Sequence, residues 1–127
     1  GNRAQILEIL EKRPEGFVVL SGNDDETLDL MKNGAEGIIS VASNVTPSMV
    51  AELAHDMLEG KVAEAEALHE KLLPLFRNCF VESNPIPAKA ALHAMGFIQN
   101  EMRLPLVPAS QPAYDLMCAT IKDLGLI

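Results

Sequence analysis

Short apolar runs alternate with helical periodicity in the N-terminal half of this chain. Residues 2–13 carry apolar side chains at spacings of three and four, which predicts an amphipathic helix. Residues 17–20 and 37–41 are instead continuous apolar runs that contain β-branched residues. A run without a polar face is typical of a strand that is covered on both sides in a parallel sheet. The pattern therefore predicts an α/β fold in which strands and helices alternate.

Turn residues and helix caps delimit the remaining elements. The acidic residues 24–26 suit the N-terminus of a helix that ends near Gly34, and residues 46–47 (Thr-Pro) open the next helix. After Gly60 the pattern is helical, apart from residues 97–109, where two prolines exclude a regular helix. Both strands therefore precede a purely helical C-terminal half.

The two expected strands cannot form a complete sheet by themselves. Each is apolar on both faces, so each requires neighbours along both of its edges, and a two-stranded ribbon is at best marginally stable. The chain must either pair with copies of itself or contribute to a larger sheet. We favour the larger sheet, which makes this chain part of a bigger protein.

Composition narrows the classes of function. The chain has 10 Lys and Arg against 18 Asp and Glu, a net charge of −8, which argues against nucleic acid or an anionic membrane surface as a partner. We see no apolar run of the about 20 residues that span a bilayer, and no signal-peptide pattern. Metal-ligand spacing is absent around Cys79 and Cys118, and around His55, His69 and His93. We therefore expect no metal site, and free thiols in a reducing cytoplasm.

Four segments together resemble a known family. They are residues 21–24 (Ser-Gly-Asn-Asp), 37–44 (Gly-Ile-Ile-Ser-Val-Ala-Ser-Asn), 84–89 (Asn-Pro-Ile-Pro-Ala-Lys) and 102–105 (Met-Arg-Leu-Pro). In order and spacing they are similar to the dihydrodipicolinate synthase family, within the N-acetylneuraminate lyase group of class I aldolases. Asn23 departs from the aspartate that is common at its position. The two later segments favour this family over the sialic-acid lyases of the same group.

The resemblance implies an architecture. The family folds as a (β/α)₈ TIM barrel with additional C-terminal helices, and this chain is similar to the C-terminal portion of that fold. The two apolar runs are then the seventh and eighth parallel strands of the barrel. Residues 1–60 would supply its last βα units, and residues 61–127 would form a C-terminal helical domain.

The resemblance also implies an activity for the parent protein. Family members condense pyruvate with aspartate semialdehyde in lysine (diaminopimelate) biosynthesis. The reaction passes through a Schiff base on a lysine, without a cofactor, and the enzymes are homotetramers. Gly1-Asn2 matches the end of the family's lysine motif, so the catalytic lysine and tyrosine are expected upstream of this chain.

No catalytic residue is therefore expected within the chain. Barrel chemistry takes place at the C-terminal ends of strands, and a Schiff-base lysine needs a desolvated site there. The lysines of this chain fall instead in expected helices or beside them, where solvated or structurally paired side chains are typical; they are Lys12, Lys32, Lys61, Lys71, Lys89 and Lys122.

Two residues are candidates for binding pyruvate. Ile39, a buried residue of the eighth strand, matches the family's isoleucine whose backbone approaches pyruvate. Gly22 ends the seventh strand, where a missing Cβ allows close backbone approach, although a plain turn glycine is an equally good explanation. Asn23 and Asn44 lie at the same rim. The acidic residues 24–26 are interpreted as helix N-terminal charge and not as an acid–base pair.

Alternative functions remain open at this point. The parent could be another pyruvate-dependent aldolase of the same group, because the residues that select the second substrate lie upstream. As an isolated chain, the protein could be a non-enzymatic packing or oligomerisation fragment.

Overall fold

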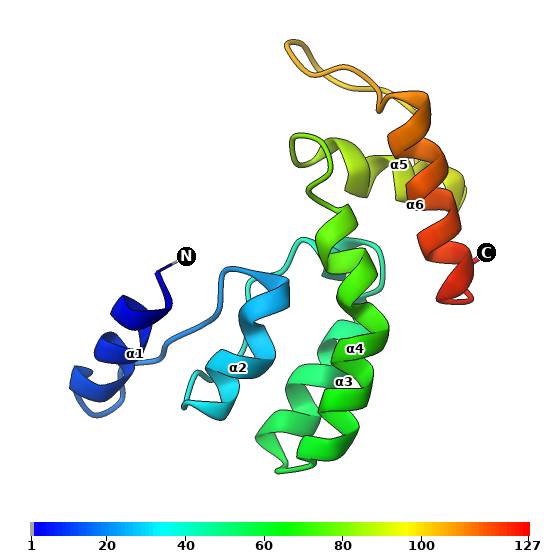
Figure 1. Cartoon of the computed structure of the whole chain (residues 1–127). Coiled ribbons are helices and arrows are strands. Elements are labelled where there is room, and N and C mark those ends of the chain that lie inside the picture. Colours follow the sequence, from blue (N-terminus) through cyan, green and yellow to red (C-terminus); the bar gives the residue numbers. More distant parts are fainter. Residues whose placement is uncertain (1) are drawn as a thin grey trace.

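The computed structural model describes residues 2–127, a helical chain with two extended segments near its N-terminus (Figure 1). Gly1, and with it the first residue of the expected lysine-motif match, lies outside the described residues. The predicted helices are confirmed within a few residues; their bounds are α1 (Arg3–Lys12), α2 (Thr27–Lys32), α3 (Pro47–Leu58), α4 (Val62–Asn78), α5 (Ile86–Ala94) and α6 (Gln111–Asp123). Two 3₁₀ turns, η1 (Asp24–Glu26) and η2 (Ala42–Asn44), precede α2 and α3.

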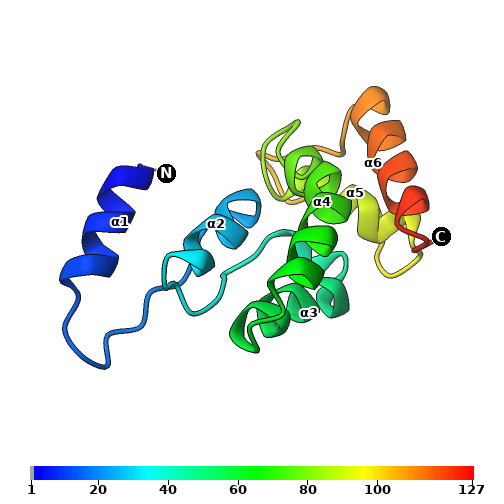
Figure 2. The ribbon, with the colours of Figure 1, turned by 60° about the horizontal axis from the view of Figure 1, so that its bottom comes forward.

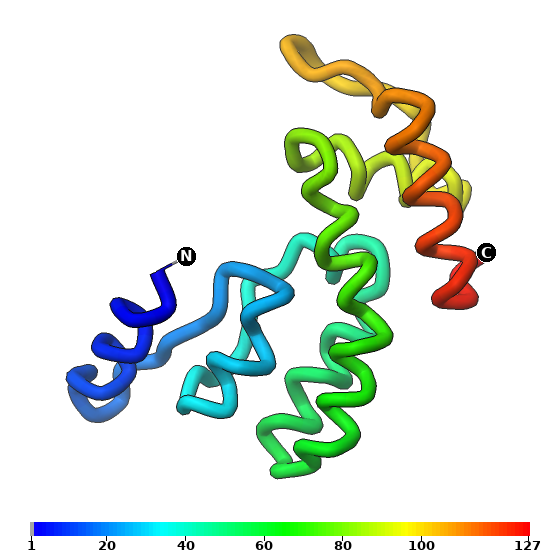
Figure 3. The backbone as a smooth tube through the Cα atoms, viewed as in Figure 1, coloured from blue at the N-terminus to red at the C-terminus, as the bar shows by residue number. Residues whose placement is uncertain are grey.

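Local signals set the helix boundaries. The side chain of Asn2 accepts a hydrogen bond from Gln5 N, 3.2 Å away, and so caps α1. Pro47 is the first residue of α3, where its missing N–H would have no partner in any case. Residues 97–110 contain no helix, as the prolines predict, and run outward beyond α5 and α6 as a projecting loop (Figure 3). None of the described helices is long and apolar enough to cross a membrane.

The two apolar runs do not form β-strands within residues 2–127. A single parallel bridge pairs Ser21 with Ile38. At this bridge Ser21 N donates to Gly37 O and Ile39 N donates to Ser21 O, each at 2.8 Å. The parallel direction thus agrees with the prediction, but the two strands themselves are not confirmed, and the segments are extended chains joined at one point.

The register explains why the ladder stops there. Two residues before the bridge, a regular parallel ladder would have Gly37 N donate to Val19 O. Glu36 N makes that bond instead, at 2.9 Å, so the pairing is one residue out of step. Gly37 lies where the slip occurs, and a Cβ there would come within 3.3 Å of the Leu20 side chain. The close approach of Leu20 therefore favours glycine at this position.

The outer edges of the bridged pair are open. Val18 and Leu20 present their backbone groups away from the bridge, and their amides have no hydrogen-bond partner in the described part of the chain. Their side chains are exposed as well, as is that of Phe17. The outer edge of this segment and these three side chains are thus uncovered by residues 2–127, whereas Ile38 and Val41 of the second segment pack against buried residues of the helices.

Burial is concentrated in the helices. α3 and α4 pack side by side and α5 and α6 cover one end of the pair, whereas α1 lies beyond α2, away from these four helices, and has no buried residue (Figure 2). The main hydrophobic cluster joins residues from both sides of position 60; its members are Ala42, Val45, Val50, Leu72, Leu75, Phe76, Cys79, Ala88, Ala91, Met117, Ile121 and Leu124. A smaller cluster of Leu30, Met31 and Ala35 packs α2 against α1 and α3. The helical half therefore provides the frame against which the extended segments are held.

Candidate functional site

The two pyruvate-binding candidates lie next to each other across the bridge. Ile39 N donates to Ser21 O, and Gly22 follows Ser21 directly in the chain. Neither residue was linked to the other by sequence spacing, because 17 positions separate them. The structure therefore brings Gly22 and Ile39 together at one rim, where the extended segments end.

Ile39 is more exposed than the sequence analysis expects. Its side chain is 71% exposed, so the prediction of a buried strand residue is wrong for the described chain. The physical reason is that no segment among residues 2–127 covers the face of the extended chain on which the Ile39 side chain stands. The Ile39 carbonyl also accepts no hydrogen bond within these residues. The amide of Ile39 is thus hydrogen-bonded to Ser21 O, whereas its carbonyl oxygen is available to another molecule.

Gly22 has open space on its Cα. A Cβ built there would meet nothing within 4 Å, and its backbone does not adopt the left-handed conformation. Neither packing nor backbone strain among the described residues therefore requires glycine here. A requirement for glycine at this position would have to come from a molecule or segment outside these contacts.

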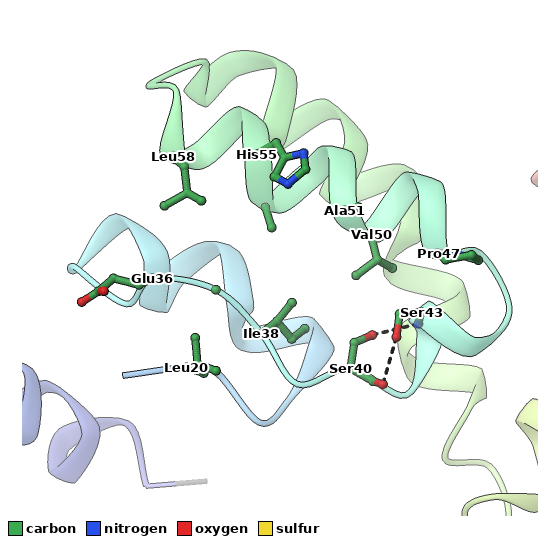
Figure 4. A pocket seen from close by; sticks show the side chains of 12 residues that line it. Leu20, Glu36, Ile38, Ser40, Ser43, Pro47, Val50, Ala51, His55 and Leu58 are labelled. Atoms are coloured by element: carbon green, nitrogen blue, oxygen red, sulfur yellow. Dashed lines mark hydrogen bonds between the residues drawn. The ribbon is translucent and has the colours of Figure 1, made fainter. Parts of the chain in front are cut away.

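A buried carboxylate joins the loops that follow the two extended segments. Asp24 is only 2% exposed, and its Oδ2 accepts from Val41 N at 3.0 Å and Ala42 N at 3.2 Å. Its Oδ1 accepts from the Ser40 hydroxyl. Ser43 completes the loop, since its N donates to Ser40 Oγ at 2.8 Å and its hydroxyl donates to Ser40 O at 3.1 Å (Figure 4).

This arrangement corrects the interpretation of Asp24 as helix N-terminal charge, because the carboxylate accepts hydrogen bonds from backbone amides of the other segment. The detectable signal is an aspartate directly after one strand-end turn and a Ser-x-x-Ser pair, Ser40 and Ser43, directly after the next apolar run. Parallel strands end at the same edge, so such residues meet.

The side-chain amides of the two rim asparagines, Asn23 and Asn44, donate hydrogen bonds to other groups of this chain. Asn23 Nδ2 donates to Glu26 Oε2 at 2.8 Å, and Asn44 Nδ2 donates to Val41 O at 3.0 Å.

Two open grooves flank the rim. One, of about 400 Å³, lies between Ile38 and α3 (Figure 4). The other, of about 320 Å³, lies between Gly22 and α1. Neither groove is lined by both Gly22 and Ile39.

The lysines have the surroundings of surface groups. All are exposed except the half-buried Lys89, whose Nζ donates to Glu101 O at 2.7 Å. The hydrogen bond to Glu59 raises the pKa of Lys61, whereas a Schiff-base lysine needs a lowered pKa. The described lysines therefore lack the desolvated surroundings of a Schiff-base lysine, and the placement of the catalytic lysine upstream stays a prediction.

The cysteines and histidines form no reactive centre in the described part of the chain. Both thiols are free, and burial, followed by the Asp24 charge, raises the pKa of Cys79 to about 12. His69 is buried beside Phe76, with ring centroids 5.8 Å apart, and burial lowers its pKa. No group of three or more His, Cys, Asp or Glu side chains among residues 2–127 is arranged to hold a metal ion.

Known proteins match nearly the whole of this chain. Residues 1–124 match the model of the Dihydrodipicolinate synthetase family. A 4-hydroxy-tetrahydrodipicolinate synthase of Thermotoga maritima is 50% identical over 123 residues, which are 97% of this chain and 42% of that protein. The corresponding protein of Fervidobacterium nodosum is 47% identical over the same length and coverage. This chain thus spans about two fifths of the length of the curated relatives it matches.

Solved structures agree with the sequence comparison. The crystal structure of dihydrodipicolinate synthase from Thermotoga maritima superposes with a TM-score of 0.94 at 45% identity, over 98% of this chain and 43% of that one. A chloride-inhibited dihydrodipicolinate synthase from Acinetobacter baumannii, complexed with pyruvate, gives a TM-score of 0.93 at 33% identity, over 99% of this chain and 43% of that one.

Proposed function

Because this chain belongs to the dihydrodipicolinate synthetase family, we propose that it is the C-terminal segment of a 4-hydroxy-tetrahydrodipicolinate synthase. The complete enzyme condenses pyruvate with aspartate semialdehyde in lysine (diaminopimelate) biosynthesis. The superposition of 98% of this chain on 43% of the Thermotoga maritima structure carries the proposal. The catalytic lysine and tyrosine belong to the preceding part of the enzyme, which forms the Schiff base.

In the complete enzyme the two extended segments are the seventh and eighth strands of a (β/α)₈ barrel. The parallel bridge between Ser21 and Ile38 and the two open edges support this assignment, because a closed barrel gives every strand two neighbours. Residues 1–60 are the last βα units and residues 61–127 the helical domain. The proposal includes a homotetramer, and a cytoplasmic location that the free thiols favour.

Within that barrel, the backbone at Ile39 and Gly22 lies against pyruvate. The unpartnered carbonyl of Ile39 and the open space at Gly22 support this role. Gly22 follows the proposed seventh strand and Ile39 lies within the proposed eighth, and barrel enzymes bind substrates at the C-terminal ends of their strands. This segment therefore contributes shape and backbone polarity to the site, and the preceding segment contributes the reactive groups.

A hybrid synthase tests the proposal. Residues 2–127 replace the matching segment of the Thermotoga maritima synthase, and condensation of pyruvate with aspartate semialdehyde is measured. We expect a rate within about tenfold of the unmodified enzyme, because the two segments share their backbone course. The enzyme truncated before this segment is the control, expected to be inactive. A folded hybrid without activity would contradict the proposed function.

The isolated chain should form no covalent adduct with pyruvate. Its lysines are solvated or paired, so none of them has the desolvated site that a Schiff-base lysine needs to attack the ketone. We expect an unchanged intact mass after incubation with pyruvate and borohydride. The hybrid synthase, treated in the same way, should gain one reduced pyruvyl group. A stable adduct on any lysine of the isolated chain would refute the placement of the catalytic lysine upstream.

Replacing Gly22 by valine should raise the KM for pyruvate in the hybrid synthase by about tenfold or more. The added side chain occupies the space that we assign to substrate, whereas nothing in the described chain obstructs it. Gly22→Ala adds one methyl group and should give a smaller increase. Thermal unfolding of both variants checks that the fold is kept. An unchanged KM in a folded Gly22→Val hybrid would show that Gly22 is only a turn residue.

A further inference from the structure

We propose that Asp24 is a positioning residue for the Ile39 backbone, which it holds in the direction that pyruvate binding requires. The inference rests on the proposed function for its substrate, while the hydrogen bonds that carry it belong to this chain alone. Asp24 itself is buried and does not contact the substrate in the proposed arrangement. It acts through residues 40–42, which follow Ile39 directly.

Hydrogen bonds to the residue before Asp24 hold the turn that carries it. The carbonyl oxygen of the preceding residue, Asn23, accepts from the Ser21 hydroxyl at 2.8 Å and from the Thr27 hydroxyl at 2.9 Å. Ser21 and Thr27 are both buried, so these bonds are shielded from water. The turn that carries Asp24 is thereby tied to the first extended segment and to α2.

The carboxylate then fixes the other segment at three consecutive residues. Its oxygens accept from the Ser40 hydroxyl and from the amides of Val41 and Ala42. The amide of Ile39 donates to Ser21 O, and the contacts with Asp24 begin at Ser40, the next residue. The chain is therefore held immediately before and immediately after the Ile39 carbonyl. Both anchors lead back to the turn at residues 21–24, which also holds Gly22. The two proposed pyruvate contacts therefore share one support.

The negative charge of the Asp24 carboxylate strengthens the hydrogen bonds that hold residues 40–42. Hydrogen bonds to an ionised acceptor are shorter and stronger than neutral ones, and burial strengthens them further. No Lys, Arg or His ion pair to Asp24 is found among residues 2–127, so the amides and the hydroxyl alone stabilise the charge. Asparagine has the same shape but only one acceptor oxygen, so it can satisfy only part of the arrangement.

The first test uses the chain itself. Asp24→Ala should accelerate amide hydrogen exchange of residues 41–43 at least tenfold, because Val41 N and Ala42 N donate to Asp24 and Ser43 N donates to Ser40 Oγ. Asp24→Asn should do so to a smaller extent. Formate, a small carboxylate, should restore protection in Asp24→Ala, whereas chloride at equal ionic strength should not. Asp25→Ala is the matched control, because Asp25 is the exposed neighbour of the same charge, and its exchange should stay unchanged. Unaltered exchange in Asp24→Ala, or equal effects of formate and chloride, would overturn the proposal.

The second test uses the hybrid synthase. Asp24→Ala should raise the KM for pyruvate at least tenfold with kcat changed less than threefold, and formate should lower that KM again. Should Asp24→Ala fail to fold, Ser40→Ala decides, with an expected rise in KM of at least threefold. An unchanged KM in the folded variant would show that the contact is only structural and would overturn the proposal. An inactive unmodified hybrid would instead refute the proposed function, a result independent of the exchange data.

Discussion

Isolated in solution, the chain is expected to self-associate and not to exist as a compact monomer of 13.7 kDa. Unpaired strand edges are templates for pairing with another chain, and both outer edges of the bridged pair are open. The exposed apolar side chains of Phe17, Val18 and Ile39 lie on the same segments. Complete burial of such a side chain contributes about 1.5–3 kcal/mol, so covering several of them favours association.

Light scattering at micromolar concentration measures the effect directly. We expect a mass of at least twice the monomer, with helical circular dichroism retained. Val18→Lys places a charge on the open edge and should shift the population toward the monomer. Val62→Lys, at the exposed start of α4, is the matched control and should leave the mass unchanged. A well-folded monomer of the unmodified chain would contradict the argument from open edges.

Two substitutions of Ile39 should differ sharply in the hybrid synthase. Ile39→Pro removes the amide that donates to Ser21 O at 2.8 Å, and proline in a central strand also displaces the backbone. We expect it to abolish pyruvate binding or folding. Ile39→Val keeps the amide and the β-branched shape, so kinetics should remain near normal. Its cost in stability should be about 0.5–1.5 kcal/mol, because the side chain is packed in the complete barrel.

Steady-state kinetics and thermal unfolding of the two Ile39 variants check this prediction. In the isolated chain Ile39 is exposed, so Ile39→Val should change the stability there by no more than about 0.5 kcal/mol. A larger loss of stability from Ile39→Val in the hybrid synthase than in the isolated chain would show that the complete barrel covers the Ile39 side chain. A large loss of pyruvate binding in Ile39→Val would instead show that the side chain, and not the backbone, contacts the substrate.

The helices were predictable because their signals are local. The acidic turn before Thr27 and the Thr46-Pro47 pair mark helix starts in the sequence, and α2 and α3 begin where these residues indicate. Gly22 and Ile39 were identified from motif resemblance, and their pyruvate contacts remain predictions. The role of Asp24 could not be predicted, because its donors at residues 40–42 are far away in sequence.

The sequence by itself determined the helical periodicity, the two apolar runs and the family, since each is carried by residue types at short spacing or in fixed order. Only the tertiary structure decided how those runs pair. The slip at Gly37, the exposure of Ile39 and the burial of Asp24 depend on contacts between segments, which side-chain pattern alone does not specify. A β-strand also needs partners for its backbone groups, and residues 2–127 provide the apolar runs with one bridge and two open edges.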